Sequence, residues 1–226
     1  MRIGVLGTGA MAGALAGSWA RAGHEVLVGG RSAAKAAELA ERAGGRAGSL
    51  REAAGFGTVA LLAVPYAALG DALRQAGAGE GVLRGRTVVD CTNALDTATM
   101  EPDPDLLAGG PSAARRIAGL AEGAHVVKGF NLAPAEVWRR SAPGPGEARV
   151  TVPLCGDDED ALTVVRTLVR DAGGEPADGG GLERAGLLEA AAAFAAGVWS
   201  QGRQPGAVFG PVPGPVSSPV ASPAAG

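Results

Sequence analysis

The sequence has few of the residues that stabilise disulfide-rich or metal-binding folds. Its 226 residues include two cysteines, Cys91 and Cys155, which lie far apart and form no Cys-x-x-Cys motif. A disulfide framework or a zinc site is therefore not expected, and this use of cysteine favours a reducing cytoplasm. Only two histidines occur, His24 and His125, and we expect both to be structural. The chain thus offers little material for a nucleophile with a partner base.

The sequence also lacks a strong charge of either sign and a long apolar run. Its 20 basic and 23 acidic side chains give a formal net charge of -3, and no basic segment is interleaved with aromatic residues. Nucleic acid and anionic membrane surfaces are therefore not expected as partners. The most apolar late stretch, residues 185–199, contains Glu189 and is too short for a membrane span. Residues 2–6 are typical of a core strand rather than of a signal peptide, so we expect a cytoplasmic globular protein.

Short apolar strands alternate with helices along most of the chain. The first strand ends at Gly7, and Gly23 is a typical residue for the C-terminal end of the first helix. Strands are expected at residues 2–6, 24–28, 58–64, 87–91, 125–128 and 149–155, and helices at residues 10–21, 32–43, 66–76, 112–122, 158–172 and 182–199. This alternation predicts an α/β fold with a doubly wound parallel sheet.

Composition and element pattern divide the chain into three parts. We expect a main domain at residues 1–140 and a small C-terminal α/β subdomain at residues 141–202. From residue 203 to 226 proline, glycine and alanine dominate, so this tail cannot bury enough apolar surface to become ordered. At least residues 211–226 are expected to be flexible.

A glycine-rich turn joins the first strand to the first helix. It matches the Gly-x-Gly-x-x-Ala fingerprint of dinucleotide sites with the residues Gly7, Thr8, Gly9, Ala10, Met11 and Ala12. Gly7 permits the tight turn, Gly9 lets a diphosphate approach the backbone, and Ala12 allows the helix to pack closely on the strand. The helix N-terminus beyond it offers free N–H groups to phosphates. A glycine turn without a ligand is the alternative, but the position between strand and helix favours a Rossmann-type dinucleotide-binding domain at residues 1–140.

The end of the second strand favours NADP(H) over NAD(H). An NAD site needs an acidic residue there to bind the ribose hydroxyls, whereas this strand is followed by Gly29 and Gly30. Arg31, Ser32 and Lys35 come next, and a guanidinium, a hydroxyl and an ammonium suit a 2′-phosphate. The alternative is that these three side chains belong to an ordinary solvated surface.

No side chain stands out as a catalytic acid, base or nucleophile. Tyr66, the only tyrosine, follows Pro65 at a strand end, where it either lines the cofactor or packs at the rim of the site. Asp90, Thr92 and Asn93 lie at another strand end, and Asn93 is placed to reach a nicotinamide amide. Direct hydride transfer between two cofactors depends more on orientation and close approach than on an acid–base residue. We therefore expect neither a catalytic side chain nor a metal.

Several segments together are characteristic of one family. They are Gly7-Thr8-Gly9, residues 22–26, Gly29 with Arg31, Lys128 with Phe130-Asn131, the run Val152-Pro153-Leu154-Cys155-Gly156-Asp157-Asp158, and residues 178–189. With them the chain resembles the NADPH-dependent coenzyme F420 reductases, which couple NADP(H) to a deazaflavin. The same domain type occurs in the cytoplasmic part of a family of metalloreductases. The run at residues 152–158 is the most specific element, because a generic Rossmann domain lacks it.

The resemblance implies a role for particular residues. The 2′-phosphate would be held by Thr8, Arg31 and Lys35. The rest of NADP would be lined by Val64, Pro65, Tyr66, Asn93 and Ala135. The second cofactor, coenzyme F420, would be bordered near the nicotinamide by Asn131 and Leu182.

The chain also departs from the family pattern. Gly30 replaces the usual serine beside Arg31, a change for which Ser32 could compensate, and Asn131 stands where some deazaflavin reductases have histidine. Ala94 replaces a frequent proline, and Gly181 and Gly186 replace a proline and an arginine. These departures leave the NADP prediction unchanged, but they leave the hydride acceptor open.

Three functions therefore remain open. The first is hydride transfer between NADPH and the deazaflavin coenzyme. The second is an NADPH-dependent reductase of another small acceptor, such as a flavin, a carbonyl or an imine. The third is an NADP-binding sensor without turnover. In each case we expect a homodimer, because the last alanine-rich helix is suited to pack against a copy of itself.

Overall fold

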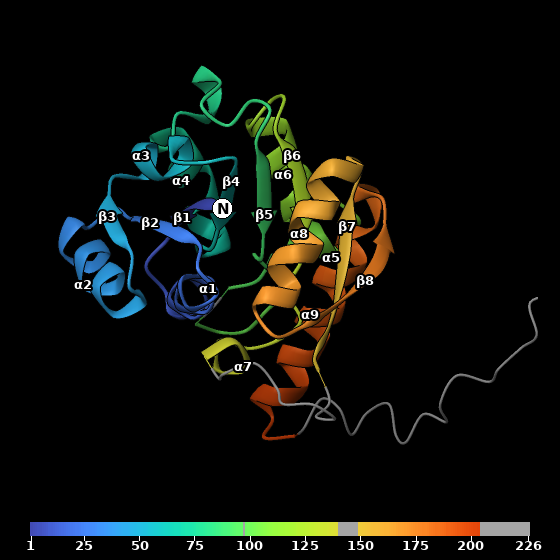
Figure 1. Cartoon of the computed structure of the whole chain (residues 1–226). Coiled ribbons are helices and arrows are strands. Elements are labelled where there is room, and N and C mark those ends of the chain that lie inside the picture. The colour runs from blue at the N-terminus through green and yellow to red at the C-terminus, as the bar shows by residue number, and fades with distance from the viewer. Residues whose placement is uncertain (97, 140–148, 204–226) are drawn as a thin grey trace, which may run out of the picture.

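One eight-stranded sheet forms the centre of the molecule. The computed structural model describes residues 1–96, 98–139 and 149–203. In their order across the sheet the strands are β3 (Arg46–Gly48), β2 (Glu25–Gly29), β1 (Arg2–Leu6), β4 (Val59–Leu62), β5 (Thr87–Asp90), β6 (His125–Lys128), β7 (Thr151–Gly156) and β8 (Glu175–Gly180) (Figure 1). The predicted doubly wound α/β fold is confirmed.

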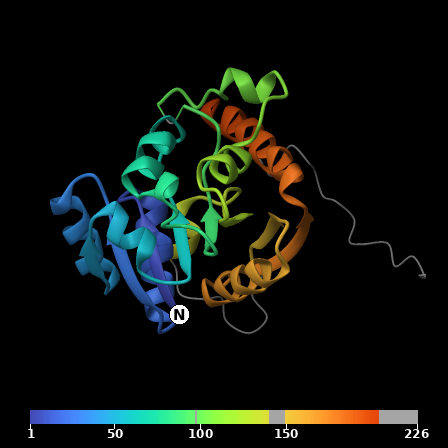
Figure 2. The same cartoon turned by 90° about the horizontal axis from the view of Figure 1, so that it is seen from above.

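Helices cover both faces of this sheet (Figures 1 and 2). One face carries α1 (Ala10–Arg21), α2 (Ala33–Ala43), α7 (Ala135–Arg139) and α8 (Glu159–Asp171). The other carries α3 (Leu50–Gly55), α4 (Leu69–Gln75), α6 (Ala113–Leu120) and α9 (Ala185–Ser200). Shorter elements are α5 (Pro104–Leu107) and the 3₁₀ turns η1 (Tyr66–Ala68), η2 (Ala78–Glu80) and η3 (Leu182–Arg184). Within the described ranges, no helix is long and apolar enough to cross a membrane.

The direction of the strands differs from the prediction at one pair. Strands β3 to β6 are parallel, as expected, but β7 runs antiparallel to β6, and β8 is parallel to β7. A parallel neighbour needs a crossover back to the opposite edge of the sheet, usually by a full helix. The helix that follows β6 is α7, which has only five residues. Among the described residues between β6 and β7 this is the only helix, and it is too short to span the sheet. The antiparallel register, with Lys128 opposite Cys155, places the start of β7 beyond the end of β6.

Strands β7 and β8 extend the sheet of the first six strands. The predicted boundary between a main domain and a subdomain, at residue 140, falls within residues 140–148, which lie outside the described part of the chain. The predicted flexible tail at residues 211–226 also lies outside it. The domain division therefore stays a prediction.

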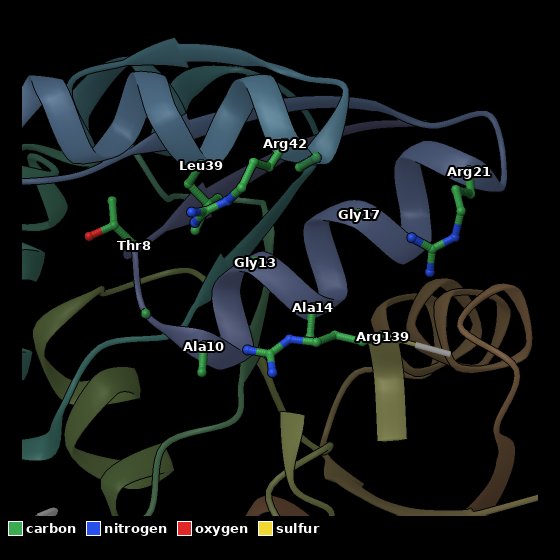
Figure 3. A pocket seen from close by; sticks show the side chains of 11 residues that line it. Thr8, Ala10, Gly13, Ala14, Gly17, Arg21, Leu39, Arg42 and Arg139 are labelled. Carbon is green, nitrogen blue, oxygen red and sulfur yellow. The ribbon is translucent and has the colours of Figure 1, made fainter. Parts of the chain in front are cut away.

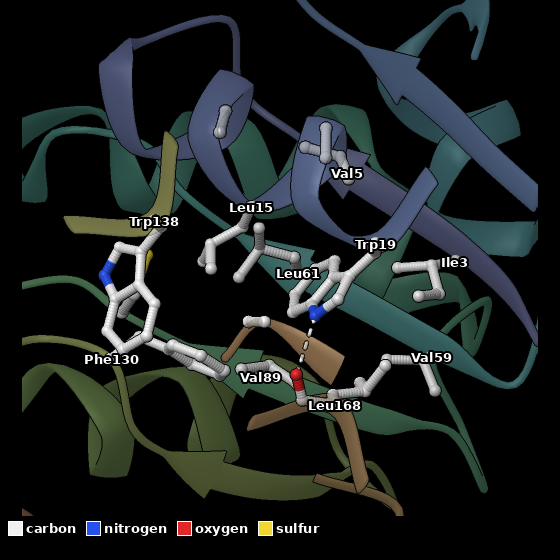
Figure 4. Packing of buried hydrophobic residues seen from close by; sticks show 14 of the residues in the cluster. Ile3, Val5, Leu15, Trp19, Val59, Leu61, Val89, Phe130, Trp138 and Leu168 are labelled. Carbon is white, nitrogen blue, oxygen red and sulfur yellow. Dashed lines mark hydrogen bonds between the residues drawn. The ribbon is translucent and has the colours of Figure 1, made fainter. Parts of the chain in front are cut away.

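Three aromatic rings fix the chain where β6 leaves the sheet (Figure 4). Phe130 packs edge-on against Trp19 and Trp138, with ring centroids 5.9 and 5.2 Å away. The indole of Trp19 also donates a 2.9 Å hydrogen bond to the carbonyl of Leu168 in α8. Phe130 has a φ of +62°, a left-handed conformation that is unfavourable for a bulky side chain. Burial of its ring between two indoles offsets this cost.

Candidate functional site

The glycine turn between β1 and α1 leaves open space where a diphosphate would lie. Gly9 is the N-cap of α1 and provides no side-chain cap for the N–H groups of the first turn. A β-carbon added at Gly9 would meet no atom within 4 Å. Gly7 has a φ of +133°, which is readily adopted only by glycine. Open backbone N–H groups at a helix N-terminus, approached without steric hindrance, fit the phosphates of a dinucleotide.

A hollow of about 280 Å³ lies beside this turn and brings together many of the predicted residues. Its lining residues are Gly7, Thr8, Gly9, Gly30, Arg31, Lys35, Leu50, Ala63, Val64, Pro65, Ala68 and Ala72. Among these lining residues, all from the described part of the chain, the charged ones are Arg31 and Lys35, so the hollow favours an anion. Ser32 has a different position, because its hydroxyl caps α2 by accepting a 3.3 Å hydrogen bond from the backbone N–H of Lys35.

The glycine at position 30 is explained by its contact with the turn. A β-carbon at Gly30 would lie 2.6 Å from the Cγ2 methyl of Thr8, which is closer than two carbons can approach. A serine at position 30, the residue expected from the resemblance, would force Thr8 to move. Thr8 and Gly30 therefore form a matched pair at the rim of this hollow.

A second and larger hollow, of about 470 Å³, lies along α1 on the other side of the turn (Figure 3). Thr8, Gly9 and Ala10 contribute to it, and its charged lining residues are Arg21, Arg42 and Arg139. The side chain of Arg139 extends from α7 toward Ala10 (Figure 3). The sequence analysis missed these arginines, because they come from three separate helices. Arg42 and Arg139 pair with Glu38 and Glu136 on their own helices, at 2.6 and 3.0 Å, so their charges are partly compensated.

Two asparagines face each other at the ends of β5 and β6. The side-chain N–H of Asn93 donates to the backbone carbonyl of Asn131 at 3.0 Å. The side-chain N–H₂ of Asn131 donates to Asn93 Oδ1 at 2.9 Å and to the backbone carbonyl of Leu188 at 3.1 Å. A backbone carbonyl can only accept a hydrogen bond, so these contacts fix which way both amides point. The predicted residues Asn93 and Asn131 are thus brought together as one pair.

A buried ion cluster lies beneath this pair. Lys128 Nζ donates to Asp90 Oδ2 at 2.8 Å and to Glu189 Oε1 at 2.7 Å, and all three side chains are fully buried. Glu189 also accepts from the backbone N–H groups of Ala113 and Ala114, at the start of α6. Burial lowers the pKa of Lys128, but the two carboxylates more than offset this, so that pKa lies above its ordinary value. The lysine is therefore charged, and its charge is paired.

The remaining predicted residues lie near the carboxyl ends of the parallel strands, except Leu182. Met11 and Ala135 pack against the core between α1 and α7, and Ala12 is buried beneath the turn. Tyr66 is half-buried in η1, where burial raises the pKa of its hydroxyl and the Arg116 guanidinium lies 5.8 Å from its ring. Leu182 is separate: it lines another hollow with Arg115, Ala118, Gly119, Asp157 and Glu183. In α9 it is Leu188, six residues further on, that contacts Asn131.

This fold and this edge define a class of protein. A doubly wound sheet with a glycine turn, an Arg/Lys hollow and polar strand ends is a Rossmann-type dinucleotide-binding domain. The family model described as NADP oxidoreductase coenzyme F420-dependent matches residues 2–94, and this part of the chain belongs to that family. The protein is therefore an NADP-dependent oxidoreductase.

Solved structures share this fold. A hypothetical protein from Sinorhizobium meliloti is 30% identical with a TM-score of 0.70, and the match covers 82% of this chain and 87% of that one. A proposed F420-dependent NADP reductase from Arthrobacter sp. FB24 is 26% identical with a TM-score of 0.74, over 89% and 95% of the two chains. An imine reductase from Myxococcus stipitatus in complex with NADP⁺ shares the fold at 20% identity and a TM-score of 0.65, over 89% of this chain and 62% of that one.

Proposed function

We propose that this protein transfers hydride between NADP(H) and the deazaflavin coenzyme F420. The observation that carries the proposal is the order of the site along one sheet edge. The Arg31–Lys35 hollow adjoins β2, the glycine turn follows β1, and the Asn93–Asn131 pair follows β5 and β6. That order matches the 2′-phosphate, the diphosphate and the nicotinamide of NADP. Membership of the family supports the deazaflavin as the second reactant.

The residues at each position fit the part of NADP assigned to them. Arg31 and Lys35 would hold the 2′-phosphate by charge-assisted hydrogen bonds, with Thr8 beside them. In the described residues, one N–H of Asn93 and the side-chain oxygen of Asn131 make no hydrogen bond. A primary carboxamide carries both a donor and an acceptor, so this pair complements the amide of nicotinamide.

The protein's part in the chemistry would be to position the reactants and exclude water. Bound NADPH supplies the hydride, and no proton has to pass through a side chain for direct transfer between two cofactors. Lys128 is fully buried and paired, so it is not available as an acid. Beside the amide pair, Leu132 is 43% exposed and offers apolar surface to a flat ring. The proposal therefore assigns no catalytic acid or base.

The direct test is stopped-flow measurement of deazaflavin absorbance with NADPH, and with NADP⁺ and reduced deazaflavin for the reverse direction. We expect reduction in at least one direction. The variant Asn131→Trp, which crowds the second-cofactor side and removes one amide of the nicotinamide pair, should block it, while 2′,5′-ADP, which carries the adenosine and phosphates without the nicotinamide, should still bind. No reduction by folded, NADPH-bound protein would reject the deazaflavin.

Other functions are then separated by a panel of acceptors. Turnover with a flavin, a carbonyl or an imine would show that the protein reduces an acceptor other than the deazaflavin. The fold that it shares with imine reductases makes an imine one acceptor to include. Binding of NADPH without turnover of any acceptor would indicate a sensor.

We further propose a homodimer that forms through α9. This helix exposes Leu187 (62%), Phe194 (56%) and Trp199 (61%). Leu107, in the neighbouring α5, is 73% exposed. Leu187 and Phe194 are seven residues apart and therefore lie on the same side of α9. Exposed apolar side chains of this kind are typical of an interface, and a second copy of the same helix supplies matching residues by two-fold symmetry.

We also propose that the protein works in the cytoplasm. Its two cysteines, Cys91 and Cys155, are both free and buried, as is usual where thiols are kept reduced. No part of this proposal requires nucleic acid or a membrane.

A further inference from the structure

The buried ion cluster and the asparagine pair are parts of one connected network. Lys128 donates to the backbone carbonyl of Thr92 as well as to its two carboxylates. Asp90 Oδ1 accepts from the backbone N–H of Thr92 at 2.8 Å. Both backbone polar groups of Thr92 are therefore bound by the cluster. Thr92 immediately precedes Asn93, so the cluster fixes the backbone from which the Asn93 amide extends.

The network returns to the cluster through α9. Asn131 donates to the carbonyl of Leu188 at 3.1 Å, and the next residue, Glu189, is bound to Lys128. The path from Lys128 through Thr92, Asn93, Asn131 and α9 thus ends where it began. Asn93 and Asn131 cannot change their separation or their orientation without strain elsewhere in this closed path.

From this closed network we propose that Lys128, Asp90 and Glu189 are positioning residues for the nicotinamide. The cluster holds the asparagine pair so that one donor and one acceptor face the carboxamide. None of its three residues lines the 2′-phosphate hollow, whose lining residues belong to the turns after β1, β2 and β4 and to α2, α3, η1 and α4. The proposal rests on the proposed NADP site and goes further, because it assigns a ligand-directed role to residues remote from the ligand.

The test compares two ligands that share one end. NADPH carries both the 2′-phosphate and the nicotinamide, whereas 2′,5′-ADP carries the adenosine and phosphates only. We expect Glu189→Gln to weaken NADPH binding about tenfold, the loss of one or two hydrogen bonds, and to change 2′,5′-ADP binding less than about twofold. Isothermal titration of the full-length protein measures both. Equal losses for the two ligands, or no loss for either, would overturn the proposal.

Controls separate positioning from a general loss of stability. Val165→Ala shortens a fully buried side chain in α8 and should lower the melting temperature without changing the ratio of the two affinities. Glu159→Gln removes an exposed carboxylate that pairs with Arg166. It should change neither the melting temperature nor the ratio of the NADPH and 2′,5′-ADP affinities. A shift of the ratio in Val165→Ala would mean that destabilisation alone produces the effect, and the proposal would fail.

A double variant tests whether the cluster acts through the asparagine. Asn93→Ala removes the amide that the cluster is proposed to place, so adding Glu189→Gln to it should cost NADPH binding little more. Fully additive losses would show that the two residues act independently. If Glu189→Gln does not fold, Asp90→Asn, which keeps Lys128 paired with Glu189, carries the same expectations. Wild-type protein that binds neither ligand would overturn the proposed function itself, and this inference with it.

Discussion

Gly7 and Gly9 lie in the same turn, but their surroundings are opposite. A β-carbon at Gly7 would lie 2.1 Å from the carbonyl oxygen of Ala63, whereas one at Gly9 would have no neighbour within 4 Å. Gly7 is needed for the turn to pack against the end of β4. Gly9 leaves space for a ligand group, which the proposal identifies as the diphosphate of NADP.

Replacing Gly7 should therefore lower the stability of the fold, whereas replacing Gly9 should lower the affinity for NADPH. Gly7→Ala should destabilise the fold by roughly 2 kcal/mol or more, because of both the clash and the positive φ. Gly9→Ala should keep the wild-type melting temperature, since its φ of -82° suits alanine, but should lose most of its NADPH affinity. Thermal unfolding and an NADPH titration check both variants. Unchanged NADPH binding in Gly9→Ala would contradict the placement of the diphosphate.

Cofactor preference should depend on Arg31. Each charge-assisted hydrogen bond to the 2′-phosphate contributes about 1.5–3 kcal/mol, so NADPH should bind about tenfold or more tightly than NADH. Arg31→Ala should remove most of this preference by weakening NADPH alone. Arg166→Ala, an arginine in α8 that lies outside the hollow, is the control. Equal affinity of the wild-type protein for the two nucleotides would refute the prediction.

The proposed dimer should separate when α9 is made polar. Phe194→Asp places a charge on the side of α9 that exposes Leu187 and Phe194, so light scattering after gel filtration should give the mass of a monomer. Leu120→Asp, at a residue of α6 that is 49% exposed, should leave the dimer intact. If the wild-type protein is a monomer at micromolar concentration, the prediction is wrong.

The thiols of the folded protein should be almost unreactive. Burial raises the pKa of Cys91 to about 12 and also raises the pKa of Cys155. Because only the thiolate reacts, alkylation should stay slow as the pH rises through the ordinary pKa of cysteine, near 8.5. Titration with a disulfide reagent should detect both thiols only after denaturation. Fast labelling of native protein would show that one of them is exposed.

The sequence predicted those parts of the fold and site that depend on local chemistry. Turn residues 7–12 could be recognised because the fingerprint and the flanking strand and helix are contiguous. Strand β8 was missed because its sequence, Glu-Pro-Ala-Asp-Gly-Gly, contains neither a β-branched nor an aromatic residue. Two other elements are too short to give a clear sequence signal. Strand β3 has only three residues, and helix α3 has six, with the capping box of Ser49 and Glu52 as its main sequence feature.

Long-range contacts could not be predicted in the same way. Lys128 and Glu189 are 61 residues apart in sequence, and no local pattern marks them as partners. Leu182 was assigned to the second cofactor from the resemblance alone. The contact of α9 with Asn131 is instead made by the backbone carbonyl of Leu188, which no side-chain pattern reveals.

The aromatic cluster around Phe130 also gives the protein an intrinsic optical reporter. Trp19 and Trp138 flank the residue that precedes Asn131, and tryptophan emission overlaps the absorption band of NADPH. Energy transfer from these two indoles would follow nucleotide binding without any label. The third tryptophan, Trp199, is exposed on α9, so its emission would respond to association of two chains. Replacing Trp199 with phenylalanine would therefore leave a fluorescence signal that reports on the nucleotide site alone.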